Sequence, residues 1–193
     1  MNQKNLLEVD WSKIPAPQDD GAAAHLVGMS IPPASLLATN DTSVVLSELK
    51  GRVVVFGFPR TGEPGRVSLV DDWDMIPGAR GCTPQTCAFR DLYAELKAAG
   101  AAYVFGLSTQ SNAYQTEMAS RLHLPFPVLS DENLELVQAL DLPTMEVAGL
   151  TLMKRIALII DDARISHVFY PVFPPDRNAG DVLAWLKGNP VRA

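Results

Sequence analysis

The pattern of apolar and polar residues along the chain predicts alternating strands and helices. The continuous apolar run over 53–58 (VVVFGF), rich in β-branched residues, is typical of a strand that is covered on both faces. Shorter apolar runs predict further strands over 103–108, 126–129, 155–160 and 165–170. Apolar residues at helical spacing predict helices over 83–99, 112–122, 133–140 and 178–186, the first of them capped by Thr83 and ended by Gly100.

The order of these elements predicts the fold class. Up to residue 140 the order is β-α-β-α-β-α, and two strands around a polar turn at 161–164 then precede a final helix. A βαβ unit followed by a ββα unit is the thioredoxin-type arrangement. We therefore expect an α/β protein with a thioredoxin-like fold, in which helices flank a central mixed β-sheet.

The distribution of proline and glycine divides the chain. With 193 residues, 47% of them hydrophobic and 20% charged, the chain can bury the core of one domain. Residues 1–24 are expected to form an extended leader, and residues 25–193 the domain. Within that domain, the glycines and prolines of 60–81 prevent regular structure over the whole segment. We interpret it as an inserted loop, and long loops in compact domains are usually functional.

Charge and the start of the chain exclude several classes of partner. The formal net charge is −6 and the basic residues do not cluster, which argues against binding to nucleic acid or to an anionic membrane. Residues 1–17 are too polar to be a signal peptide or a membrane span. The cytoplasm is therefore the expected location.

The two cysteines lie close together, at positions 82 and 87. In a reducing compartment such a pair is more often redox-active or metal-binding than a structural disulfide. A metal site is disfavoured because the histidines, at 25, 123 and 167, are far from the pair in the sequence. We therefore expect redox chemistry without a metal or other cofactor.

Cys82 lies at the start of a predicted helix. The unpaired N–H groups there favour a thiolate, which is the form of cysteine that attacks a peroxide. The sulfenic acid that results can condense with a second thiol, here Cys87, to give a disulfide. Five residues of helix rise about 7.5 Å, whereas a disulfide needs Cα atoms within roughly 6.8 Å. The first turn must therefore unwind, and Gly78 and Gly81 would ease that movement.

Residues 81–91 (GCTPQTCAFRD) resemble the active-site helix of peroxiredoxins of the bacterioferritin-comigratory, or Q, subfamily, whose pattern is G-C-T-x-x-x-C-x-F-R-D. The resemblance extends from about residue 27 to 186. It implies that Cys82 is the peroxidatic cysteine and Cys87 the resolving cysteine. It also implies that Arg155 is the cation that holds the thiolate and polarises the peroxide, and that Pro59 shields the site.

The same resemblance implies an activity and its partners. The protein would reduce hydrogen peroxide and organic hydroperoxides, and thioredoxin or a similar dithiol would reduce the disulfide that forms. Both cysteines belong to one chain, so a monomer can complete the cycle, and we expect a monomer or a homodimer.

The chain departs from the subfamily pattern at one position. The pattern is Pro-x-x-x-Thr-x-x-Cys, but Ala79 stands three residues before Cys82. Thr61 or Thr83 would have to supply the missing hydroxyl. We favour Thr61, because residues 59–61 keep part of the subfamily order.

Two other functions share these features. A thioredoxin-like disulfide oxidoreductase needs C-x-x-C at the helix start and a proline before the later strand, whereas this chain has C-x4-C, with Lys154 and Arg155 before that strand. A non-catalytic redox sensor could use the same reversible disulfide to switch a partner. Turnover with a peroxide and a dithiol would separate a sensor from an enzyme.

Overall fold

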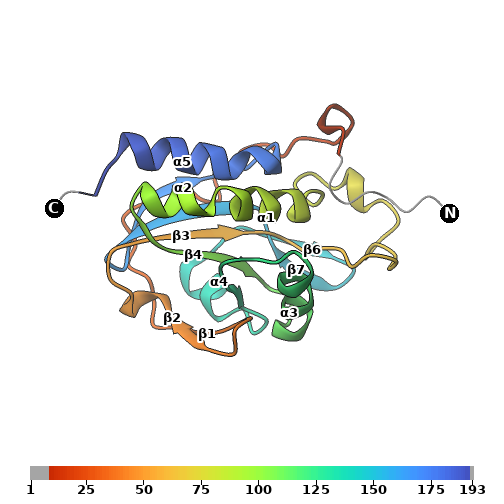
Figure 1. Ribbon diagram of the computed structural model, residues 1–193. Helices are drawn as coiled ribbons and strands as arrows, with labels where there is room; N and C mark the ends of the chain where they lie inside the picture. The colour runs from red at the N-terminus through yellow and green to blue at the C-terminus, as the bar shows by residue number, and fades with distance from the viewer. Residues whose placement is uncertain (1–8, 192–193) are drawn as a thin grey trace.

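The computed structural model describes residues 9–191 and is built around a seven-stranded sheet (Figure 1). The strand order is β2-β1-β5-β4-β3-β8-β9. These strands are β1 (Ser35–Ala38), β2 (Ser43–Val45), β3 (Arg52–Gly57), β4 (Ala101–Ser108), β5 (Val128–Ser130), β8 (Ile156–Asp161) and β9 (Arg164–Phe169). A separate hairpin consists of β6 (Thr144–Val147) and β7 (Leu150–Met153).

Helices connect these strands and cover both faces of the sheet. The α-helices are α1 (Cys82–Asp91), α2 (Tyr93–Ala98), α3 (Asn112–Arg121), α4 (Glu135–Leu140) and α5 (Asn178–Gly188). Short 3-10 helices are η1 (Trp11–Lys13), η2 (Leu46–Glu48), η3 (Trp73–Met75) and η4 (Pro175–Arg177). Within residues 9–191, no helix has both the length and the apolar character needed to cross a membrane.

The pairing of the strands confirms the expected thioredoxin-like fold. Strands β3, β4 and β5 are parallel, while β8 runs antiparallel to β3 and forms a hairpin with β9. This mixed sheet is what a βαβ unit followed by a ββα unit produces.

The apolar run of β3 is buried on both faces. Val53 and Val55 belong to one core cluster and Val54 and Phe56 to another, because successive side chains of a strand point to opposite faces. In Figure 1, α1, α2 and α5 lie on one side of the sheet and α4 on the other. Helix residues from both sides therefore enclose the central strand.

The helix predicted over 83–99 differs from the structure in two ways. It is divided into α1 and α2 at Leu92, whose backbone leaves helical values at φ −98° and ψ 9°. It also begins at Cys82, two residues before the first helical residue that a Thr83 cap implies, and its N-cap is Gly81 at φ +106°. The prediction of Thr83 as the cap was wrong, because only glycine adopts such a φ at low cost. Cys82 is consequently the first residue of the helix.

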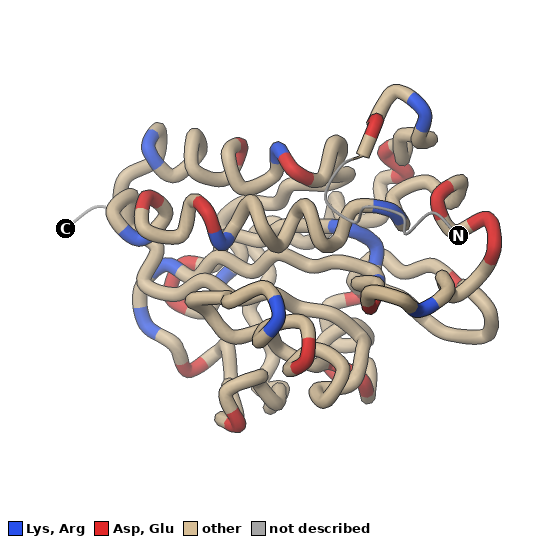
Figure 2. The backbone as a smooth tube through the Cα atoms, turned by 45° about the vertical axis from the view of Figure 1, so that its right-hand side comes forward, with Lys and Arg blue, Asp and Glu red and all other residues tan. Residues whose placement is uncertain are grey.

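The segment over 60–81 has a small apolar core of its own. Trp73 and Ala79 pack against Val147 and Leu152 of the β6–β7 hairpin. Acidic and basic positions are interspersed along this segment and along the rest of the backbone (Figure 2). The segment is thus packed onto the domain next to the first turn of α1.

Candidate active site

The topology of the sheet brings Arg155 to the start of α1. Strand β3 ends at Gly57, which pairs with Ile156 at the beginning of the antiparallel β8. The residue before β8, Arg155, therefore lies at the same edge of the sheet from which the chain leaves β3 toward Cys82. Residues 73 positions apart in sequence meet there.

The Arg155 guanidinium contacts the sulfur of Cys82. Its Nη2 lies 3.3 Å from Cys82 Sγ and also donates to the carbonyls of Gly78, Ala79 and Arg80, at 3.1, 3.3 and 3.1 Å. The turn that precedes α1 thus holds the arginine while the arginine holds the sulfur. Both side chains are buried, with 2% and 3% of their surface exposed for Arg155 and Cys82.

The side chains of Gln85 and Asn178 hold the other terminal nitrogen of the guanidinium, Nη1. Arg155 Nη1 donates to Oε1 of Gln85 at 2.5 Å, and Gln85 Nε2 donates to Oδ1 of Asn178 at 2.9 Å. Gln85 and Asn178 are both buried. The arginine is consequently connected through α1 to the first residue of α5.

The charge of Arg155 has no carboxylate partner among the residues that the structure describes. Its acceptors there are an amide oxygen, three carbonyls and the Cys82 sulfur. A buried cation is costly unless an anion accompanies it. The Cys82 sulfur is the group in contact with the guanidinium that could carry a negative charge.

One donor of Arg155 is unused. Its Nε is buried and has no hydrogen-bond partner within residues 9–191. An unsatisfied buried donor costs free energy, so a ligand oxygen that accepted from it would bind favourably.

The predicted hydroxyl and proline lie in the adjoining loop. The Thr61 hydroxyl donates to Gln110 Oε1 at 3.2 Å and, in the described part of the chain, makes no hydrogen bond to Cys82. The Pro59 carbonyl accepts from Ser108 Oγ at 3.2 Å. Thr83, the alternative, is buried in α1 at 4% exposure. The structure brings Cys82 and Arg155 into contact. Within residues 9–191, neither the Thr61 hydroxyl nor the Thr83 hydroxyl is hydrogen-bonded to Cys82.

Cys87 lies one turn further along α1 and is a free thiol, as is Cys82. Both cysteines belong to the core cluster between α1 and the sheet. Burial raises the pKa of the Cys87 thiol above its usual value, and Asp91 adds to the rise, while Arg90 and Arg121 oppose it. Burial therefore favours the uncharged thiol form of Cys87.

A cavity of about 120 Å³ lies on one side of Arg155. Its walls come from the N-terminal segment, the turn before α1, the β6–β7 hairpin and the loop after β9. The lining residues are Pro17, Gln18, Pro77, Gly78, Met145, Lys154, Arg155, Tyr170 and Pro171. Within residues 9–191, no group of three or more His, Cys, Asp or Glu side chains could hold a metal ion.

Two residues of the site were not predicted from the sequence. Gln85 was detectable, because its spacing of three from Cys82 places both side chains on one face of the helix. Asn178 carries no such local signal, since its partner Gln85 is 93 positions away.

A thioredoxin-like fold with a cysteine at a helix start, held by a buried arginine, defines a class of thiol-dependent redox proteins, and comparison with known proteins agrees. Residues 26–183 match the Redoxin family model. Peroxiredoxin Q, chloroplastic, of Oryza sativa subsp. japonica is 32% identical over 162 residues, which are 83% of this chain and 66% of the rice protein. The protein of the same name from Triticum aestivum is 31% identical over 177 residues, 88% of this chain and 73% of the wheat protein.

Solved structures show the same fold. Peroxidoxin BcpB from Mycobacterium tuberculosis superposes with a TM-score of 0.67 at 25% identity, over 86% of this chain and 98% of that one. Xanthomonas campestris peroxiredoxin Q, at 22% identity, has a TM-score of 0.64 over 81% of this chain and 90% of that one. The chain belongs to the peroxiredoxins, in the bacterioferritin-comigratory or Q subfamily.

Proposed function

We propose that this protein is a thiol-dependent peroxidase in which Cys82 is the peroxidatic cysteine. The observation that carries the proposal is the 3.3 Å contact between Arg155 Nη2 and Cys82 Sγ in a buried site. The guanidinium provides the positive charge that a thiolate needs away from water. Membership of the peroxiredoxins supports the same assignment.

The reaction begins with attack of the Cys82 thiolate on the terminal oxygen of a hydroperoxide. An S–O bond forms, the O–O bond breaks, and the leaving alkoxide or hydroxide takes a proton to become an alcohol or water. Arg155 Nε is buried and unpaired in the described part of the chain, and we propose that it donates to a peroxide oxygen. The charge that develops on the leaving oxygen is thereby stabilised.

Thr61 is the hydroxyl that we propose for substrate binding, in place of the threonine that the subfamily has at position 79. Its side chain is buried beside Pro59, which would shield the site, and its hydroxyl bonds Gln110 Oε1. Reaching the peroxide would require that bond to rearrange. Thr83 stays the alternative.

Cys87 is proposed as the resolving cysteine. Its sulfur attacks the sulfenic sulfur of Cys82, the S–O bond breaks, and the hydroxyl leaves as water with the thiol proton. A dithiol, thioredoxin or a similar protein, would then reduce the Cys82–Cys87 disulfide. We propose hydrogen peroxide and organic hydroperoxides as substrates, a monomer or homodimer as the active state and the cytoplasm as the location.

The test is consumption of hydrogen peroxide and cumene hydroperoxide with thioredoxin, thioredoxin reductase and NADPH. Wild type should turn over and Cys82→Ser should be inactive. Cys87→Ser should lose turnover with thioredoxin and accumulate a sulfenic acid that a dimedone probe detects. Absence of turnover in wild type would contradict the proposal and favour a redox sensor.

A further inference from the structure

The N-terminal segment, residues 9–24, lies across the start of the active-site helix and is called the strap below. In Figure 1 it passes beside the beginnings of α1 and α5. Its two ends are fixed to the domain by polar contacts. At one end Trp11 Nε1 donates to Asp176 of η4 at 2.9 Å, and at the other Asp20 bonds Lys154 and Tyr170 at 2.6 and 2.8 Å.

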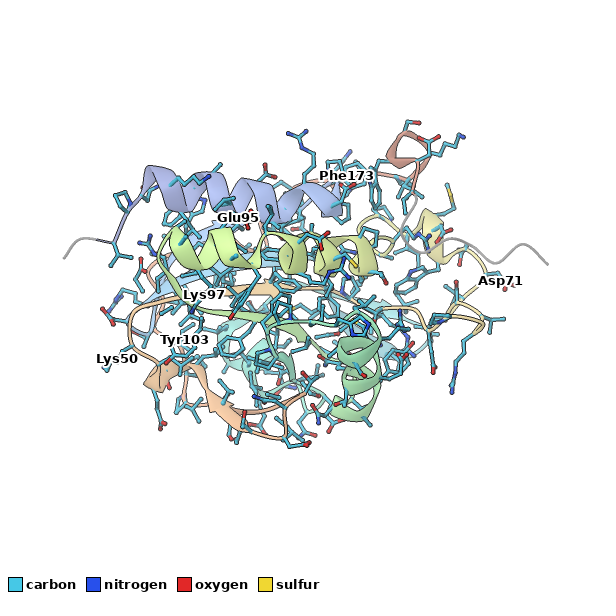
Figure 3. The ribbon with its side chains drawn as sticks, in the orientation of Figure 1. Lys50, Asp71, Glu95, Lys97, Tyr103 and Phe173 are labelled. Atoms are coloured by element: carbon cyan, nitrogen blue, oxygen red, sulfur yellow. The ribbon has the colours of Figure 1, made fainter. Side chains whose placement is uncertain are left out.

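The Trp11 ring packs directly against Gly81, the N-cap of α1. A Cβ atom on Gly81 would lie 2.7 Å from the Trp11 ring and 2.6 Å from Pro175. The ring also meets Phe173 edge to face at 5.9 Å between centroids, and Figure 3 shows Phe173 near the start of α5. Trp11 is therefore held in place by its own partners and, in turn, covers Gly81.

The strap also reaches the turn that binds Arg155. Pro17 would lie 3.7 Å from a Cβ atom on Gly78, whose carbonyl accepts from Arg155 Nη2. Gly78 and Gly81 flank the turn between them, and they are the glycines expected to ease its movement. The strap thus contacts both glycines of the turn over 78–81, which we call the peroxidatic turn.

Disulfide formation requires this turn to move. Cys82 and Cys87 are five residues apart in α1, so the first turn of the helix must unwind before their sulfurs can bond. Unwinding displaces Gly81, and with it the surface on which Trp11 packs. Contacts made only in the folded helix stabilise the reduced form over the disulfide form.

We propose that Trp11 is a positioning residue that holds the peroxidatic turn folded, and that resolution requires the turn to leave it. This inference rests on the proposed function of Cys82 and Cys87. Trp11 favours the arrangement that reacts with peroxide and slows the condensation of the Cys82 sulfenic acid with Cys87. It therefore lengthens the time during which a second peroxide can oxidise that sulfenic acid to sulfinic acid.

The kinetic test separates the two oxidation steps by stopped-flow fluorescence and by mass spectrometry of quenched samples. Trp11→Ala should leave sulfenic acid formation within about threefold of wild type and should speed disulfide formation about tenfold, the order of effect expected when the apolar contact of a large ring is lost. Trp11→Phe keeps a ring against Gly81, so its rate of disulfide formation should lie between those of wild type and Trp11→Ala. Lys13→Ala is the matched control, because Lys13 lies in the same short helix with its side chain 79% exposed.

Equal rates of resolution in Trp11→Ala and wild type would overturn the proposal, as would an equal slowing of both steps. A second measurement does not depend on peroxidase activity. Equilibration of the Cys82–Cys87 pair with reduced and oxidised dithiothreitol should show the disulfide favoured about tenfold more in Trp11→Ala, because the ring contact on Gly81 is absent. If wild type lacks turnover but this equilibrium shifts, the peroxidase assignment fails and the role of Trp11 stands. If the equilibrium is unchanged, the role of Trp11 fails.

Discussion

Gln85 Nε2 donates to Asn178 Oδ1 across 2.9 Å, and this bond joins the active-site helix to the start of the last helix. On its other side, Gln85 accepts from the guanidinium of Arg155. The amide of one glutamine therefore helps to fix the position of the Arg155 guanidinium with respect to both helices. An amide suits this position because it can accept from the arginine and donate to the asparagine at the same time.

Gln85→Met should lower the rate constant for Cys82 oxidation about tenfold, since Arg155 loses a charge-assisted hydrogen bond and can leave the sulfur. The rate is measured by stopped-flow mixing of the reduced protein with hydrogen peroxide. Gln138→Met, at an exposed position of α4, is the control and should react like wild type. Unchanged oxidation of Gln85→Met would show that the three backbone carbonyls suffice to hold the arginine.

Arg155→Met should lower the same rate constant by about 10²- to 10³-fold, the usual loss when a donor to the developing charge is removed. Arg155→Lys should recover little of it, because an ammonium cannot contact the sulfur, Gln85 and the turn together. Arg90→Met is the comparison, since Arg90 contacts Asp91 and the Leu122 carbonyl instead. A loss in Arg90→Met equal to that in Arg155→Met would point to general charge and not to position.

The rate of disulfide formation should rise with pH, because burial raises the pKa of Cys87 and the thiolate is the attacking form. Below that pKa the thiolate fraction grows tenfold per pH unit, so the rate should increase about tenfold from pH 6 to pH 7 and again to pH 8. Sequential mixing, with peroxide first and the new pH second, measures it. A flat profile would show that unwinding of α1, and not Cys87 ionisation, limits the step.

Gly81→Ala should lower the free energy of unfolding by about 2 kcal/mol or more, because alanine is strained at φ +106° and its methyl group would collide with Pro175 and Trp11. Urea unfolding followed by circular dichroism measures the change. Gly180→Ala should act in the opposite direction by roughly 0.5–1 kcal/mol, since Gly180 lies within α5 and a Cβ there meets no atom within 4 Å. A similar change in the free energy of unfolding for Gly81→Ala and Gly180→Ala would contradict this prediction.

The main elements of the fold could be predicted from the sequence because their signals are local. The run over 53–58 and the hairpin around 161–164 both appear in the structure, as β3 and as β8–β9. Strands β1, β2, β6 and β7 were not predicted, because each has only three or four residues and a partly exposed pattern. Such strands depend on their neighbours more than on their own residues.

The residues of the candidate site also differ in whether the local sequence indicates them. Cys82 could be placed from its position at a helix start, and Arg155 from the resemblance to a family. Contacts such as that of Trp11 with Asp176, 165 positions apart, are decided by tertiary packing and leave no local pattern. Ala79 illustrates the limit, because the structure shows it packed with Trp73, Val147 and Leu152 where the subfamily has a hydroxyl.

The three carbonyls that receive Arg155 Nη2 belong to residues 78–80, the last part of the loop between β3 and α1. The position of Arg155 therefore depends on the backbone of this loop. A chimaera in which residues 60–81 are replaced by the corresponding connection of a relative would replace these three carbonyls, and with them the contacts that hold Arg155 Nη2. Such an exchange should therefore treat the turn over 78–80 and Arg155 as one structural unit.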